Sequence, residues 1–123
     1  MTRENVGHGS IVVAGERLLS AIGEIRSLLG GNIQIVTRAI DAAQGAVDEY
    51  NHVIAGTPYP VVVIPGALSL GLGTLDAIRL QVTTAVDAEQ LAITTNQATI
   101  RSQRMIVTAR QELIDRYRSD PTP

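Results

Sequence analysis

The sequence predicts an all-α protein built as one long antiparallel helical hairpin. Apolar residues recur at steps of three and four from Leu18 to Ile54, which is the spacing of one face of a helix. No Gly or Pro interrupts the chain from Leu75 to Asp120, so a second helix over 75–118 would be about 65 Å long at 1.5 Å per residue. The length of 123 residues fits a single domain, and an apolar content of 45% is enough for a core.

The first arm of the hairpin is predicted over residues 11–55, after a polar, Gly-containing leader at 1–10. Ser10 is a suitable N-cap for this arm. The apolar positions form a heptad-like seam with one extra four-residue step between Leu29 and Ile33. Such a seam indicates a helix that packs against another helix.

Gly30 and Gly31 lie at that extra step. Each Gly costs about 1 kcal/mol relative to Ala inside a helix, so the pair marks a weak point. Asn32 could cap a new helix beyond it. Because the seam continues past the glycines, one long arm with a kink is the favoured interpretation, and a three-helix bundle with a break at Gly30 and Gly31 is the alternative.

The first arm ends at Gly56, and a loop is predicted over 56–74 because Pro58 and Pro60 cannot continue the helix. Four β-branched residues stand between Pro60 and Pro65, which favours an extended backbone. This segment either lies over the helices or forms an apolar tip that contacts a partner or a membrane surface. On the second interpretation its residues are partner-binding candidates: Val61, Val62, Val63 and Ile64.

The second arm is predicted over 75–118, with a tail at 119–123. Apolar residues recur every seven positions in two rows: Ile93, Ile100, Val107 and Ile114, and beside them Leu91, Ala98 and Met105. Two paired helices cover only one face of each other, so a second row left exposed predicts an interface. We therefore expect the chain to pair with itself as a four-helix bundle or higher oligomer, or with a related helical chain, using Leu91 and Met105.

The chemistry of known catalytic and cofactor sites is missing from the sequence. The chain has no Cys, and its two histidines, His8 and His52, have no third ligand nearby. Residues 71–76 match the start of the dinucleotide fingerprint, but Asp76 replaces its last Gly. We therefore predict a non-enzymatic protein that uses no cofactor or metal.

Charge and hydropathy narrow the choice of partner and location. A net charge of −2 argues against general nucleic-acid binding. The most apolar stretch, 60–72, is shorter than the roughly 20 residues that a membrane-spanning helix needs. The expected location is the cytoplasm, with export without a cleaved signal as the alternative.

Two long helical arms over 11–118, with no enzyme motif, resemble in their architecture the WXG-motif family of type VII secretion substrates; Gly56-Thr-Pro-Tyr-Pro60 stands at the turn between the arms, and Tyr117 to Asp120 at the end. In this chain the turn has no Trp-x-Gly, and Asp120 comes one position earlier than the acid of the family's export tail. The resemblance implies a helical hairpin that pairs as a four-helix dimer and is exported without a cleaved signal. A structural subunit of a phage particle or other large assembly is the alternative, since such subunits also use extended hairpins without catalytic residues.

Overall fold

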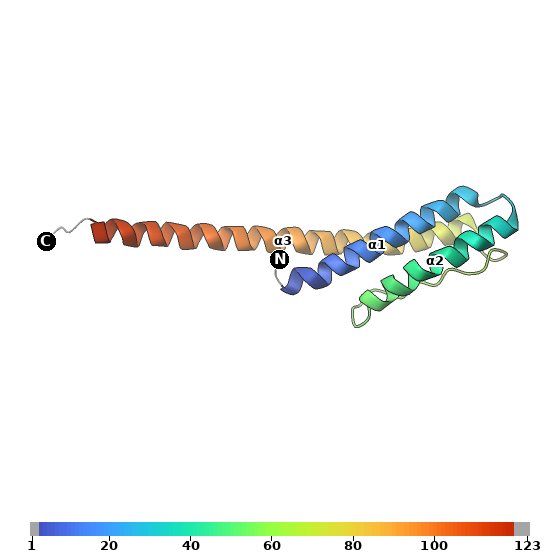
Figure 1. The fold of residues 1–123 in the computed structure, drawn as a ribbon, viewed down its shortest axis with the longest axis horizontal. Helices are drawn as coiled ribbons and strands as arrows, with labels where there is room; N and C mark the ends of the chain where they lie inside the picture. Colours follow the sequence, from blue (N-terminus) through green and yellow to red (C-terminus); the bar gives the residue numbers. More distant parts are fainter. Residues whose placement is uncertain (1–2, 120–123) are drawn as a thin grey trace.

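The computed structural model describes residues 3–119, which form three helices. α1 spans Arg3–Leu28, α2 spans Ile33–Val53 and α3 spans Leu72–Ser119. α1 packs against both α2 and α3, and α3 runs on well beyond the start of α1 (Figure 1). No strand occurs between residues 3 and 119. The all-α prediction is confirmed, but the described chain is three packed helices and not a hairpin of two long arms.

The predicted first arm is broken by a turn at residues 29–32. Gly30 has a φ of +89°, in the left-handed region that Gly adopts without steric cost and that commonly ends helices. Asn32 caps α2, because its side-chain oxygen accepts a hydrogen bond from the Gln34 backbone N–H at 2.8 Å. The interpretation of 11–55 as one kinked arm was therefore wrong. The break at Gly30 and Gly31, held as the alternative, is what the structure contains.

α1 starts earlier than the sequence predicted. Residues 3–10, expected to be a leader, are helical. Two features anchor this end of the helix to α3: Ile11 and Ala14 are buried in the core, and the His8 side chain contacts Glu89. These tertiary contacts offset the weak helix propensity of Gly7 and Gly9. The rest of the leader, residues 1–2, and residues 120–123 of the predicted tail lie outside the described part.

Residues 54–71 connect α2 to α3 without regular structure. Gly56 allows the chain to turn with a φ of +82°. Val62 and Ile64 are buried, whereas Val61 and Val63 are exposed. This alternation is that of an extended segment with one face against the core. The segment therefore lies over the helices, as the first of the two sequence interpretations has it.

Two side chains hold the extended segment in place from either side. On α2, the Asn51 amide accepts a hydrogen bond from the Val62 N–H at 2.8 Å and donates one to the Val62 carbonyl at 2.9 Å. On α3, Gln81 Nε2 donates to the carbonyls of Pro60 and Val61 at 2.9 and 3.2 Å. The segment thus bridges α2 and α3, and these side chains satisfy both backbone groups of Val62 and the carbonyls of Pro60 and Val61 without a partner strand.

The core draws on all three helices and on the connecting segment. The largest fully buried side chains are Tyr50, Leu18, Ile22, Ile25, Ile54, Leu75, Val62 and Val82. Most of them belong to the seams that the sequence predicted. α1 and α3 approach closely at Gly15, where an added Cβ would overlap the Val86 side chain. Close packing of this kind makes the core sensitive to any added methyl group.

Candidate interaction surface

The C-terminal part of α3 projects from the rest of the molecule. Every residue from 101 to 118 is exposed, and these residues, here called the α3 arm, extend past the other helices (Figure 1). At 1.5 Å per residue the arm is about 27 Å long. The remainder with described side chains, residues 7–100, is called the body.

The exposed arm carries a high density of large apolar side chains. They are Met105, Ile106, Val107, Leu113, Ile114 and Tyr117. Contiguous exposed apolar area of the kind that neighbouring members of this set form is typical of a protein contact. A helix without tertiary packing is also only marginally stable in water. The exposed apolar side chains of the arm are thus consistent with a protein partner.

Five of those six side chains share a face with the core. Along α3 the residues facing α1 include Leu75, Val82 and Glu89, all buried. Continuing at the same average spacing of 3.5 residues leads to Ile106, Val107, Leu113, Ile114 and Tyr117. Met105 lies on the opposite side of the helix. The arm thus extends the packing face of α3 beyond the end of α1.

The structure places some of the predicted partner-binding residues on the surface and others in the core. Leu91 and Met105 are exposed on α3, and Val61 and Val63 are exposed on the connecting segment. Val62 and Ile64 are core residues, so their side chains are not presented to a partner. Sequence reasoning did not select Ile106 and Leu113. Their position directly before Val107 and Ile114, in the row that was recognised, is the signal that could have found them.

Charge separates the arm from the body. The arm holds five arginines and two acidic residues, a net charge of +3, whereas the body holds four arginines and eight acidic residues, a net charge of −4. The net positive charge of the arm favours an acidic binding partner over a basic one.

One carboxylate of the body is buried between α1, α3 and the connecting segment. Glu89 is 7% exposed, contacts the His8 ring and accepts a hydrogen bond from the Tyr59 hydroxyl at 2.8 Å. Desolvation, reinforced by this hydrogen bond and by the negative charge of Glu89, raises the pKa of Tyr59 to about 12. The phenol therefore stays protonated and donates to Glu89 at neutral pH. The cluster joins α1, α3 and the connecting segment.

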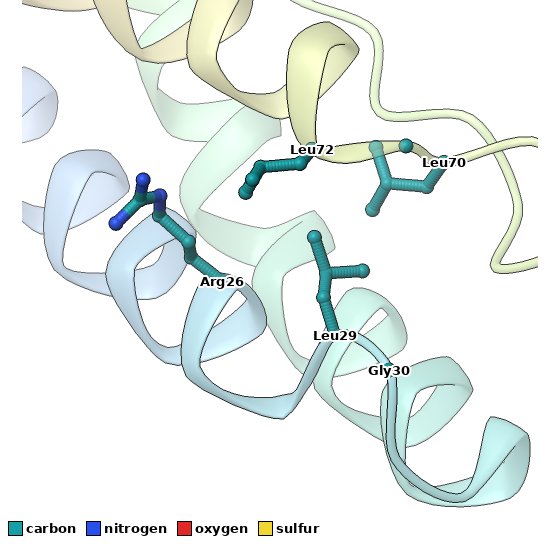
Figure 2. Close-up of a pocket in the computed structure, with 6 residues that line it drawn as sticks. Arg26, Leu29, Gly30, Leu70 and Leu72 are labelled. Atoms are coloured by element: carbon teal, nitrogen blue, oxygen red, sulfur yellow. The ribbon is translucent and has the colours of Figure 1, made fainter.

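The described residues include an open hollow but no cluster of metal-ligating side chains. They contain no group of three or more His, Cys, Asp or Glu side chains that could hold an ion. An open hollow of about 570 Å³ lies where α1 ends and α3 begins. In Figure 2, Leu29, Leu70 and Leu72 surround it beside Arg26, whose Nε already bonds to Asp76 at 3.1 Å. The hollow is thus lined by polar and apolar surface in similar measure, and its guanidinium is engaged within the fold.

Comparison with known proteins assigns this chain to no family, so its class is known only from its fold. No family model, no curated protein and no solved structure matches this chain. Among residues 3–119 no helix is both long enough and apolar enough to cross a membrane. The geometry of the arm therefore carries the functional argument.

Proposed function

We propose that this chain is a non-enzymatic helical protein–protein interaction module and that the α3 arm is its binding face. The observation that carries the proposal is the set of large apolar side chains on a part of α3 where every residue from 101 to 118 is exposed. The partner is a second copy of the chain or a related helical protein. Export as a type VII-like substrate stays a prediction from the sequence.

The proposal is tested by affinity capture from an extract of the source organism with three baits. The first is the unchanged protein, the second carries Val107→Asp on the packing face, and the third carries Thr108→Asp beside it. A charge at Val107 should abolish binding of the specific partner, because an unpaired charge cannot be buried cheaply. The exposed Thr108 should tolerate the same change. Equal recovery of every captured protein by all three baits would contradict the proposal.

The alternative function, a structural subunit of a large assembly, uses the same arm differently. If an arm binds the next copy without reciprocity, the contacts propagate into an open array, whereas a reciprocal contact closes as a dimer. Particles that grow with concentration in the purified protein would favour the structural subunit. A defined small complex would favour the interaction module.

A further inference from the structure

We propose that the α3 arm pairs with a helix of a different chain, one that carries acidic side chains on and beside its own apolar face. This inference rests on the proposed function, because it names the chemistry of the partner of the same arm. The arguments are the course of the packing face along α3, the distribution of charge around the arm, and the faces that the other described helices present.

The packing face of α3 becomes exposed in steps along the helix. At intervals of seven residues, Val86 is buried against α1, Ile93 is half-buried and Val107 is exposed. Every residue from 101 to 118 is exposed, although the face keeps the spacing of a helix that packs on another helix. A helix bound to the arm would therefore continue the line of α1 without displacing it.

One basic side chain lies inside the packing face of the arm. Gln103, Arg110 and Tyr117 recur every seven positions along the centre of this face, so Arg110 lies between the apolar layers at Val107 and Ile114. A helix that covers these two layers also removes water from the Arg110 guanidinium. A charge taken out of water is destabilising unless an opposite charge pairs with it. The partner must therefore offer a carboxylate opposite Arg110.

The other charges of the arm are divided between two sides of the helix. Basic residues follow the edges of the packing face: Arg104, Arg116 and Arg118. The two acidic residues of the arm, Glu112 and Asp115, fall on the opposite side. The surface that a partner would meet is thus basic around its apolar residues, which favours acidic side chains along the edges of the partner helix.

The packing face of a second copy does not supply those acidic side chains. Between residues 96 and 118 no acidic residue falls on this face. The next acid along it, Glu89, is buried and already bonded to His8 and Tyr59. Two arms placed face to face would therefore bring arginines together without a carboxylate between them.

The helices of the body do not present a suitable face to the arm of another copy. Their exposed large apolar residues are Val13, Ile33, Ile35, Leu72, Leu80 and Leu91. No two of these are three or four residues apart, so none of these described helices shows the continuous apolar stripe that would cover the arm. The charge and the apolar pattern together point to a helix of another chain.

The centre of the packing face distinguishes a helical partner from a lipid surface. An amphipathic helix on a membrane buries the middle of its apolar face in the bilayer. In the arm this middle contains Gln103 and Arg110. Between two helices, by contrast, single polar layers are common and fix the register of pairing.

The test uses purified full-length protein and two synthetic amphipathic peptides of about four heptads. Both peptides have the same Leu and Ile residues on the apolar face. One has Glu at the centre of that face and along its edges, and the other has Lys at the same positions. Fluorescence anisotropy should show that the acidic peptide binds about tenfold or more tightly than the basic peptide.

Two charge reversals separate the packing face from net charge alone. Arg110→Glu lies within the face, whereas Arg101→Glu lies on the far side of the arm and changes the net charge equally. Arg110→Glu should weaken binding of the acidic peptide about tenfold or more and strengthen binding of the basic peptide. Arg101→Glu should change both affinities little. Val107→Asp should weaken binding of the acidic peptide.

Several outcomes overturn the acidic helix as partner. They are equal or undetectable binding of the two peptides, an equal effect of the two charge reversals, or a dimer of the unchanged protein that Val107→Asp dissociates. If one of these occurs while Val107→Asp still abolishes capture from the extract or self-association, the chemistry of the partner is wrong and the proposed function stands.

Other outcomes overturn the proposed function as well. Binding to vesicles of phosphatidylserine and phosphatidylcholine that depends on Val107, without binding of any protein or peptide, would make a lipid surface the occupant. If Val107→Asp alters none of peptide binding, self-association and capture, the arm is not a binding face and both proposals fail.

Discussion

Gly15 shows how a single missing side chain decides how closely two helices approach. The residue is buried in α1, and a Cβ built on it would overlap the Val86 Cγ2 of α3. Val is β-branched and has little rotamer freedom in a helix, so it cannot move aside easily. Gly23, in the same helix, is exposed and has no atom within 4 Å of such a Cβ.

The two glycines should therefore respond oppositely to the same substitution. Gly15→Ala is expected to lower the free energy of unfolding, because overpacking costs about 1–3 kcal/mol and helix propensity returns only about 1 kcal/mol. Gly23→Ala gains the propensity without the overlap and should raise the free energy of unfolding by up to about 1 kcal/mol. Urea denaturation of both variants measures the difference. Equal stabilisation by both changes would show that α1 and α3 do not approach closely at Gly15.

Tyr50 is a fully buried residue whose hydroxyl has no hydrogen-bond partner among the described residues. An unsatisfied buried polar group costs about 1–3 kcal/mol. Tyr50→Phe should therefore raise the melting temperature. Tyr117→Phe is the matched control and should leave it unchanged, since Tyr117 is 77% exposed. A lower melting temperature for Tyr50→Phe would indicate that the hydroxyl makes a stabilising contact, for instance with a buried water.

The raised pKa of the Tyr59 hydroxyl predicts how the free energy of unfolding changes with pH in the alkaline range. Its pKa is raised from 10.0 to about 12 in the folded protein, so the folded state holds this proton more tightly than the unfolded state. The resulting stabilisation is complete below pH 10 and is lost as the pH rises through 12. Burial also raises the pKa of Tyr50, which adds to the same slope.

Tyr59→Phe should therefore make stability less dependent on pH over that interval and should also lower it at neutral pH. The neutral-pH loss follows because Glu89 then lacks one of its two partners. Free energies of unfolding measured from neutral pH to pH 12 test both effects. An unchanged slope would mean that Tyr59 titrates alike in the folded and unfolded chains.

At the scale of the elements, the segment 54–71 behaves as part of the core and not as a free loop. Replacing Val62 and Ile64 together with Ser should lower the free energy of unfolding by about 3–6 kcal/mol, given about 1.5–3 kcal/mol for each buried side chain. The matched control is Ser at the exposed Val61 and Val63, which should change stability little. Chemical denaturation followed by circular dichroism separates the two. If the variant with Ser at Val62 and Ile64 is as stable as the control, the segment is not part of the core and is again a candidate partner-binding site.

Periodicity predicted which residues of these elements are buried but not where one helix ends. The seam residues of α2, from Val36 to Tyr50, are buried as expected, because a 3.6-residue repeat fixes a face wherever the helix lies. The same seam continues past Gly30 with only one extra four-residue step, so the apolar spacing did not distinguish a kink from a reversal of the chain. The reversal depends on backbone conformation and on the cap at Asn32. Similarly, the β-branched residues 61–64 predict an extended segment, but they do not predict that the side-chain amides of Asn51 and Gln81 hold it.

At the scale of the whole molecule, the projecting arm is a consequence of that reversal. α1 has 26 residues and α3 has 48, so α1 cannot cover all of α3. The sequence interpretation assumed two arms of nearly equal length, which leaves no overhang. Leu91 and Met105 were therefore predicted as surface residues, while the larger exposed face around Val107 and Ile114 was assigned to the seam. Locating that surface required knowing where the partner helix ends.

A body that does not depend on its arm should survive the loss of residues 101–123. The described part of that stretch, 101–118, is wholly exposed, so its removal takes no side chain from the core. We expect the shortened chain to keep a cooperative melt, because the core residues and the Glu89 cluster remain. It should sediment as a monomer, and its melting temperature should not vary with protein concentration. The unchanged chain should melt at a higher temperature when the acidic peptide is added, since binding stabilises the folded state by mass action, and the shortened chain should not. If the shortened chain unfolds, the arm contributes to the fold of its own body. If it still responds to the peptide, the contact lies elsewhere on the body.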